Sequence, residues 1–142
     1  MLETVSIKTS REASLGEYLE TLDFFVENVT DHVTKVTREG EQPVYIHKDG
    51  NNLYFEVDLG GIAGVGSQDL YFDLLNLNTT ILPVSVGIDS TDADDPRLVL
   101  VESREVTNLD DNEVLSVFNA LELACDKVEE ILAKHISNGG AA

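Results

Sequence analysis

The stretch VLSVFNALELACDKVEEILAKH, residues 114–135, carries the clearest structural signal in the sequence. Its apolar residues recur at steps of four and three positions, which is the spacing of one face of an α-helix. The members of this stripe are Val114, Phe118, Leu121, Cys125, Val128, Leu132 and His135. Asp110 and Asp111 precede the stripe, and Lys134 and His135 lie at its end, as the helix dipole favours. We therefore predict a long closing helix with one face against the core.

Two β-hairpins are predicted upstream of this helix. Residues 43–47 and 53–59 are rich in β-formers, and an Asp-Gly turn signal at positions 49–50 separates them. Residues 84–88 and 97–101 form the second pair, joined by the acidic turn 89–96. Alternation within 53–59 gives an apolar and a polar face, so the sheet is predicted to be antiparallel.

Two shorter helices complete the predicted fold. Ser14-Leu15-Gly16-Glu17 has the spacing of a capping box, and apolar residues then recur at helical spacing as far as Val29. A strand is expected at 33–37, where β-branched residues cluster. Ser67 begins a short helix that runs through Leu77.

The order of these elements predicts the fold class. Helix, hairpin, short helix, hairpin and long helix read as an α+β fold. The length and composition predict one domain over residues 1–142, with flexible ends at 1–10 and 137–142.

The charge and the cysteine count narrow the class of partner. The 142 residues include 27 Asp and Glu but only 9 Lys and Arg, for a net charge of −18. Such a field repels phosphate backbones and anionic lipids, so we expect neither nucleic acid nor membrane as a partner. It attracts basic partners, although solubility alone also explains it. A single cysteine and no visible signal peptide predict a cytoplasmic protein.

No catalytic, metal-binding or cofactor-binding motif is recognised in the sequence. The glycine-rich run 60–66 is followed directly by Ser67 and lacks the lysine of a phosphate-binding loop, so a flexible turn explains it better. The acidic residues of 89–95 lack the frame of a calcium loop and predict a solvated hairpin tip. His32, His47 and His135 lie on three different predicted elements, which leaves zinc unsupported. We therefore expect no cofactor and no enzymatic activity.

One segment suggests a family. Residues 74–78 read Leu-Leu-Asn-Leu-Asn on the short helix, and Gly-Ile-Asp at 87–89 ends the next strand. Together with the strand from Arg97, the acidic loop and the long closing helix, this order resembles the type III secretion chaperone superfamily, which comprises CesT-like and YbjN-like bacterial proteins. The resemblance covers residues 14–136.

The resemblance implies a twisted antiparallel sheet with helices packed on one side, a homodimer, and a protein or peptide client. Client binding would involve the apolar positions of the first helix, namely Leu15, Tyr18, Leu22, Phe25 and Val26. The dimer contact would involve four residues of the short helix: Leu70, Tyr71, Leu74 and Leu75. Any amphipathic helix also needs such residues for its own core.

Three functional hypotheses follow. The first is a chaperone-like or adaptor protein that binds a partner polypeptide as a homodimer. The second is a regulatory or structural bacterial protein of the same fold with no secretion role. The third is a small enzyme, which would need two converging carboxylates or a carboxylate–histidine pair in a pocket.

Overall fold

The computed structural model describes residues 1–7 and 13–140. The chain divides into two compact units, Met1–Val57 with Glu102–Asn119 (unit 1) and Asp58–Val101 with Ala120–Ala142 (unit 2). The flexible ends expected at 1–10 and 137–142 fall in part on residues 8–10 and 141–142, which lie outside the described residues.

The largest sheet of the fold has six antiparallel strands, which confirms the predicted α+β class. Its hydrogen-bonded order is β3-β4-β5-β6-β8-β7. The strands span Phe25–Asn28 (β3), Val33–Thr37 (β4), Val44–Asp49 (β5), Asn52–Gly61 (β6), Ser85–Asp89 (β7) and Arg97–Glu105 (β8). Both predicted hairpins are present, and Asp49 pairs with Asn52 across the Asp-Gly turn. The second strand of each hairpin is longer than predicted, because β6 continues to Gly61 and β8 to Glu105.

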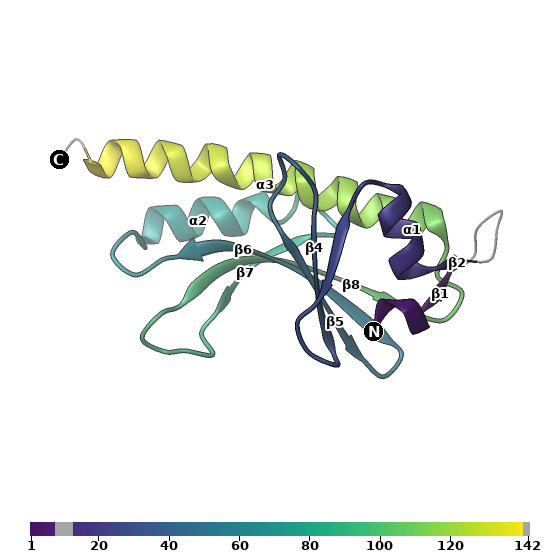
Figure 1. Ribbon diagram of the computed structural model, residues 1–142. Helices are drawn as coiled ribbons and strands as arrows, with labels where there is room; N and C mark the ends of the chain where they lie inside the picture. Colours follow the sequence, from purple (N-terminus) through teal and green to yellow (C-terminus); the bar gives the residue numbers. More distant parts are fainter. Residues whose placement is uncertain (8–12, 141–142) are drawn as a thin grey trace. The chain divides into compact units, whose positions relative to one another are not determined.

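Unit 1 begins with elements that the sequence did not predict. A 3-10 helix, η1 (Leu2–Thr4), precedes the short strands β1 (Ser6–Ile7) and β2 (Ala13–Ser14). Both η1 and β2 contact helix α1 (Leu15–Thr21), as Figure 1 shows. The predicted cap of α1 is confirmed, because the hydroxyl of Ser14 accepts a hydrogen bond from the Glu17 amide at 3.2 Å.

Helix α1 ends at Thr21, so the predicted continuation to residue 29 is wrong. The Leu22 amide donates to the carbonyls of Leu19 and Glu20, and Asp23 then adopts a left-handed backbone with φ of 68°. An aspartate tolerates this conformation, which cannot continue a right-handed helix. Phe25 and Val26 consequently lie on β3, paired with Thr37 and Val36 of β4.

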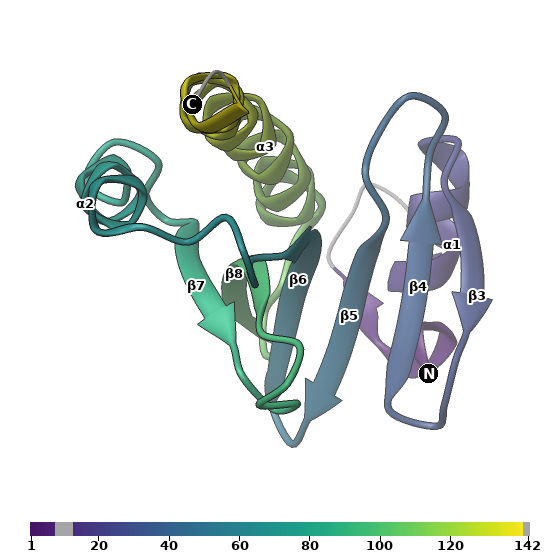
Figure 2. The same cartoon turned by 90° about the vertical axis from the view of Figure 1, so that its left-hand side faces the viewer.

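Strands β3–β6 lie side by side, with α1 behind β3 and β4 in the view of Figure 2. The buried residues of unit 1 gather on one face of these strands. Leu53, Phe55 and Val57 are at most 1% exposed, as their alternation predicted. Phe118 of helix α3 (Asp111–Gly140) packs edge-on against Phe55, with ring centroids 5.9 Å apart. The ring of Phe24 also packs against that of Phe118, with ring centroids 4.7 Å apart. The start of α3 therefore closes this core with aromatic contacts.

Unit 2 contains α2 (Gln68–Leu77), β7, the adjoining parts of β6 and β8, and the remainder of α3. The predicted start of α2 is confirmed, because the Ser67 hydroxyl accepts from the Leu70 amide at 3.1 Å. Buried residues from α2, β8 and α3 form the core of this unit: Leu70, Leu74, Leu98, Leu100, Leu121, Ala124 and Val128. The predicted stripe of α3 is thus confirmed as a buried face as far as Val128.

None of the helices in the described part of the chain combines the length and the apolar character that crossing a bilayer requires.

Candidate functional site

The face of the unit 1 sheet opposite its core carries aromatic and charged side chains. We call it the outer face. Its members on β3–β6 are Phe25, Glu27, Val33, Lys35, Thr37, Tyr45, His47, Tyr54 and Glu56. Two of its aromatic residues reach far into solvent, since Phe25 is 67% and Tyr54 43% exposed. An exposed phenylalanine on a sheet face offers contact area to another molecule.

Cross-strand pairs arrange the outer face. Lys35 lies between Glu27 and Tyr45 in the strand register, so opposite charges neighbour each other. The His47 imidazole is 3.5 Å from the carboxylate of Glu56, from Nε2 to Oε2. The outer face therefore combines exposed aromatic rings with both signs of charge, which suits contact with a polypeptide.

The five residues assigned to client binding from the sequence differ in exposure. Leu15 is fully buried in unit 1, and Leu22 and Val26 are half-buried. Tyr18 is half-buried too, and its hydroxyl donates to the Asp111 carbonyl at 3.4 Å. Burial and the neighbouring Asp111 carboxylate raise the pKa of Tyr18. Phe25 is the one member of this set that is largely exposed, and it belongs to β3 rather than to the helix.

Sequence reasoning missed Tyr54 as a member of this surface. Alternation along β6 did place Tyr54 opposite the apolar face of Leu53 and Phe55. Its exposure, beside that of Phe25, could therefore have been anticipated from the pattern. Local spacing did not reveal that α1 ends at Thr21 and that Phe25 therefore lies on the sheet.

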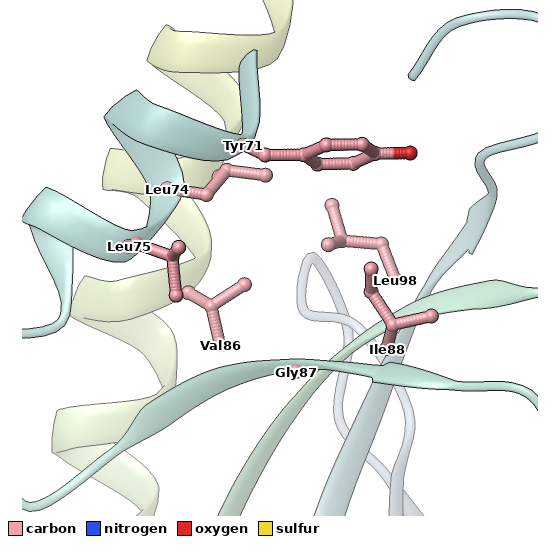
Figure 3. Close-up of a pocket in the computed structure, with 7 residues that line it drawn as sticks. All are labelled: Tyr71, Leu74, Leu75, Val86, Gly87, Ile88 and Leu98. Atoms are coloured by element: carbon pink, nitrogen blue, oxygen red, sulfur yellow. The ribbon is translucent and has the colours of Figure 1, made fainter. Parts of the chain in front are cut away.

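Unit 2 has a pocket of about 330 Å³ between α2 and the β7–β8 hairpin (Figure 3). We call it the α2–β7 pocket. It is lined by Tyr71, Leu74 and Leu75 of α2, by Val86, Gly87 and Ile88 of β7, and by Leu98 of β8. Val86 and Ile88 point from the strand towards α2, and Gly87 between them adds no side chain. With a lining so largely apolar, the pocket suits an apolar side chain and offers a charged ligand no charged partner.

The four residues assigned to a dimer contact also fall into two groups. Leu70 and Leu74 are at most 3% exposed and mainly support the core of unit 2. Leu75 is 67% exposed and Tyr71 is half-buried, and both line the α2–β7 pocket. Sequence reasoning missed Ile88, 49% exposed, because only the fold brings β7 beneath α2.

Gly66 explains how Tyr71 covers one side of the pocket. A Cβ atom at Gly66 would overlap the Tyr71 hydroxyl oxygen and come within 2.8 Å of the ring carbon Cζ. The ring can therefore lie across the pocket, as Figure 3 shows, only because residue 66 lacks a side chain. This close approach gives one glycine of the 60–66 run a packing role.

The acidic residues around the β7–β8 turn have structural partners. The Arg97 guanidinium contacts the carboxylates of Asp58 at 3.2 Å and Asp95 at 3.3 Å, and the Asp58 hydrogen bond raises the pKa of Arg97. Asp89 accepts from the hydroxyl and amide of Thr91, which lowers the pKa of that carboxyl. Within the described residues, no group of three or more His, Cys, Asp or Glu side chains is placed to hold a metal ion.

Unit 2 contains a carboxylate–histidine pair of the kind that the enzyme hypothesis needs. His135 Nε2 of α3 lies 2.7 Å from Asp73 Oδ2 of α2, and both side chains are partly buried. Neither residue lines the α2–β7 pocket. The pair links helices α2 and α3 within unit 2.

The fold is similar to that of solved proteins of type III secretion systems. The chain matches one from the heterodimeric ExoU–SpcU complex of Pseudomonas aeruginosa, with a TM-score of 0.67 and 17% identity. The match covers 82% of this chain and 96% of that one. The Yersinia pestis secretion chaperone SycH, in complex with a fragment of YscM2, gives a TM-score of 0.56 at 19% identity, covering 82% and 95%. A comparison with curated protein sequences finds no match.

These similarities confirm the resemblance in fold, and the sequence supports it independently. Residues 9–137 match the sequence profile of one protein family. That span contains α1, the six-stranded sheet, α2 and nearly all of α3. The chain belongs to the CesT_Tir_1 family.

Proposed function

We propose that this protein binds a segment of a partner polypeptide, as a type III secretion chaperone does, and that it works as a homodimer. The observation that carries the first part is the outer face of unit 1, where Phe25 and Tyr54 stand exposed on a sheet. Membership of the CesT_Tir_1 family and the similarity to chains from the ExoU–SpcU and SycH–YscM2 complexes support it.

The charge of the chain supports a particular kind of partner. A net charge of −18 draws basic segments towards the protein and repels acidic ones. On the outer face, Glu27 and Glu56 stand close to exposed aromatic rings. We therefore expect a client segment that alternates apolar and basic side chains, so that rings meet the apolar residues and carboxylates meet the basic ones.

Replacing Phe25 by serine is expected to weaken binding of such a segment about tenfold, because an exposed aromatic anchor is lost. Fluorescence anisotropy with a labelled peptide of alternating valine and lysine would measure the change. Leu123→Ser serves as the matched control, since Leu123 is 58% exposed on α3 and lies outside both the outer face and the lining of the pocket in unit 2.

A valine–glutamate peptide should bind more weakly than the valine–lysine peptide at low salt, and added salt should reduce the difference. Equal weakening by Phe25→Ser and Leu123→Ser would count against the outer face as the client site. Failure of the unsubstituted protein to bind any extended peptide would favour a protein of the same fold without a client.

The second part of the proposal, the homodimer, is supported by the α2–β7 pocket. Leu75 and Ile88 are 67% and 49% exposed at its margin, and Phe72 lies exposed on the same helix. A second copy that presents the same residues would cover this apolar area, as a two-fold symmetric interface requires. Its burial would offset the repulsion between two acidic chains.

Replacing Leu75 by glutamate is expected to weaken self-association by at least about tenfold, because each copy would bring a charge to an apolar contact. Sedimentation equilibrium would give the dissociation constant. Leu123→Glu is the matched control, because Leu123 is 58% exposed on α3 and does not line the pocket. A monomer at all concentrations, or a larger effect of Leu123→Glu, would contradict this dimer surface.

A further inference from the structure

Asn78 forms two hydrogen bonds to a single residue of β7. It caps the C-terminal end of α2, and its side-chain carbonyl accepts from the Val86 amide at 2.7 Å. Its amide nitrogen donates to the Val86 carbonyl, with 3.4 Å between nitrogen and oxygen. One carboxamide thus supplies both the acceptor and the donor that a neighbouring strand would supply to Val86.

The groups that Asn78 occupies lie on the free side of the sheet. β7 is the terminal strand in the order β3-β4-β5-β6-β8-β7, with β8 on its other side. Val86 stands opposite Leu100 of β8, yet its amide and carbonyl bind Asn78, so both point away from β8. Backbone groups of a strand alternate in direction, so the amide and carbonyl of Ile88 point to the same free side.

The free edge of β7 is therefore open over a short length. The Val84 amide donates to the Ile81 carbonyl at 3.0 Å, and both groups of Val86 are taken by Asn78. No hydrogen bond to the Ile88 amide or carbonyl from this side is found among the described residues, so Ile88 can offer a strand-like donor and acceptor. An incoming strand could make one pair of hydrogen bonds at Ile88, but it would have to displace Asn78 to reach Val86.

The same edge adjoins the apolar surface proposed for the homodimer. Val86 and Ile88 both line the α2–β7 pocket, together with Leu75 of the helix. A second copy docked on this pocket would bring its own β7 close to the edge, where two antiparallel strands can extend a sheet. Whether the sheet is extended depends on the groups available at Val86.

We propose that Asn78 is a gate on the free edge of β7. Its carboxamide takes the place of a partner strand at Val86, so the second copy docks through the side chains of α2 and the pocket without extending the sheet. This inference rests on the proposed homodimer surface and concerns its regulation. It also assigns a role to the last residue of the Leu-Leu-Asn-Leu-Asn segment, 74–78.

Asn78→Ala is the direct test, with Asn76→Ala as the matched control on the exposed side of the same helix end. Amide exchange by NMR at low concentration is expected to show the Val86 amide exchanging about tenfold faster in Asn78→Ala and unchanged in Asn76→Ala. Asn78→Asp, which keeps an acceptor for the Val86 amide but loses the donor, should fall between these variants.

Sedimentation equilibrium at high ionic strength, where repulsion between the acidic chains is screened, tests the gate itself. The association constant of Asn78→Ala is expected to rise about tenfold over that of Asn76→Ala, from the strand hydrogen bonds made available. In the associated form of Asn78→Ala, the Val86 and Ile88 amides should both become protected from exchange.

The outcomes of these experiments distinguish the proposed role of Asn78 from the proposed homodimer. An association constant for Asn78→Ala that equals or falls below that of Asn76→Ala would overturn the gate, whether or not the wild type is a dimer. A monomeric wild type together with associating Asn78→Ala would contradict the proposed homodimer and keep the gate. Association of Asn78→Ala without protection of the Val86 and Ile88 amides from exchange would also overturn the gate.

Discussion

Replacing Phe118 by alanine is expected to lower the free energy of unfolding by about 3–5 kcal/mol. Phe118 is 2% exposed and its ring contacts Phe24 and Phe55 in the core of unit 1. Alanine would remove both aromatic contacts and leave a cavity that the helix backbone cannot fill by a small shift. Urea denaturation followed by circular dichroism would measure the loss.

Leu123→Ala is the control for this prediction, because Leu123 lies on the same helix as Phe118, is 58% exposed and does not line the α2–β7 pocket. We expect it to change the free energy of unfolding by no more than about 0.5 kcal/mol. If Phe118→Ala also lowered the free energy of unfolding by no more than about 0.5 kcal/mol, the central position of Phe118 in the unit 1 core would be contradicted. Since domains are stable by only about 5–15 kcal/mol, Phe118→Leu offers a milder variant if the alanine variant fails to fold.

Glu102→Gln is expected to stabilise the protein near pH 7 by about 1–3 kcal/mol, because a buried charge is replaced by a neutral side chain of the same shape. The Glu102 side chain is 1% exposed, and Arg104 Nη2 approaches its Oε1 to 2.8 Å. The orientation of this ion pair is not that of a hydrogen bond, and neither carboxylate oxygen accepts one from the described residues. Burial raises the pKa of Glu102, and the positive charge of Arg104 offsets this only in part.

The raised pKa of Glu102 makes its contribution to stability depend on pH. With a folded-state pKa above the usual value of 4.5, the folded protein holds a proton on Glu102 more tightly than the unfolded chain. The stability that this group contributes is greatest below pH 4.5 and is lost as pH rises through the folded-state pKa. The stability difference between Glu102→Gln and wild type should therefore be small at pH 4 and increase towards pH 7.

Thermal or urea unfolding at several pH values would give this difference directly. Glu105→Gln is the matched control, since Glu105 is exposed at the end of the same strand. A constant difference from pH 4 to pH 7 would contradict the burial of the Glu102 charge, and so would a Glu102→Gln variant that is less stable than wild type at pH 7.

Local sequence patterns were sufficient for most elements of this fold. The stripe from Val114 to Val128, the caps at Ser14 and Ser67, and the Asp-Gly turn each state a local preference of the chain. In all of these positions the fold agrees with the local preference. The reason is that caps, turns and amphipathic spacing depend on residues within a few positions of one another.

The region from Leu22 to Val29 shows the limit of such patterns. Its apolar residues have helical spacing, so a continuous helix was a reasonable prediction. The same residues are also good strand formers, and pairing of Phe25–Asn28 with β4 decided between the two conformations. Pairing depends on partners distant along the chain, so local spacing could not reveal it.

In the candidate surfaces, too, local patterns predict some features, and long-range packing alone determines the others. Residue alternation was enough to place Tyr54 on the solvent side of β6 and Leu75 on an amphipathic helix. Only long-range packing brought Tyr71 and Leu75 of α2 above Val86 and Ile88 of β7, which makes the pocket. Three further features also depend on long-range packing: the hydrogen bonds between Asn78 and Val86, the Asp73–His135 pair and the burial of Glu102. Each depends on the relative position of two elements, and this position results from the packing of the whole unit.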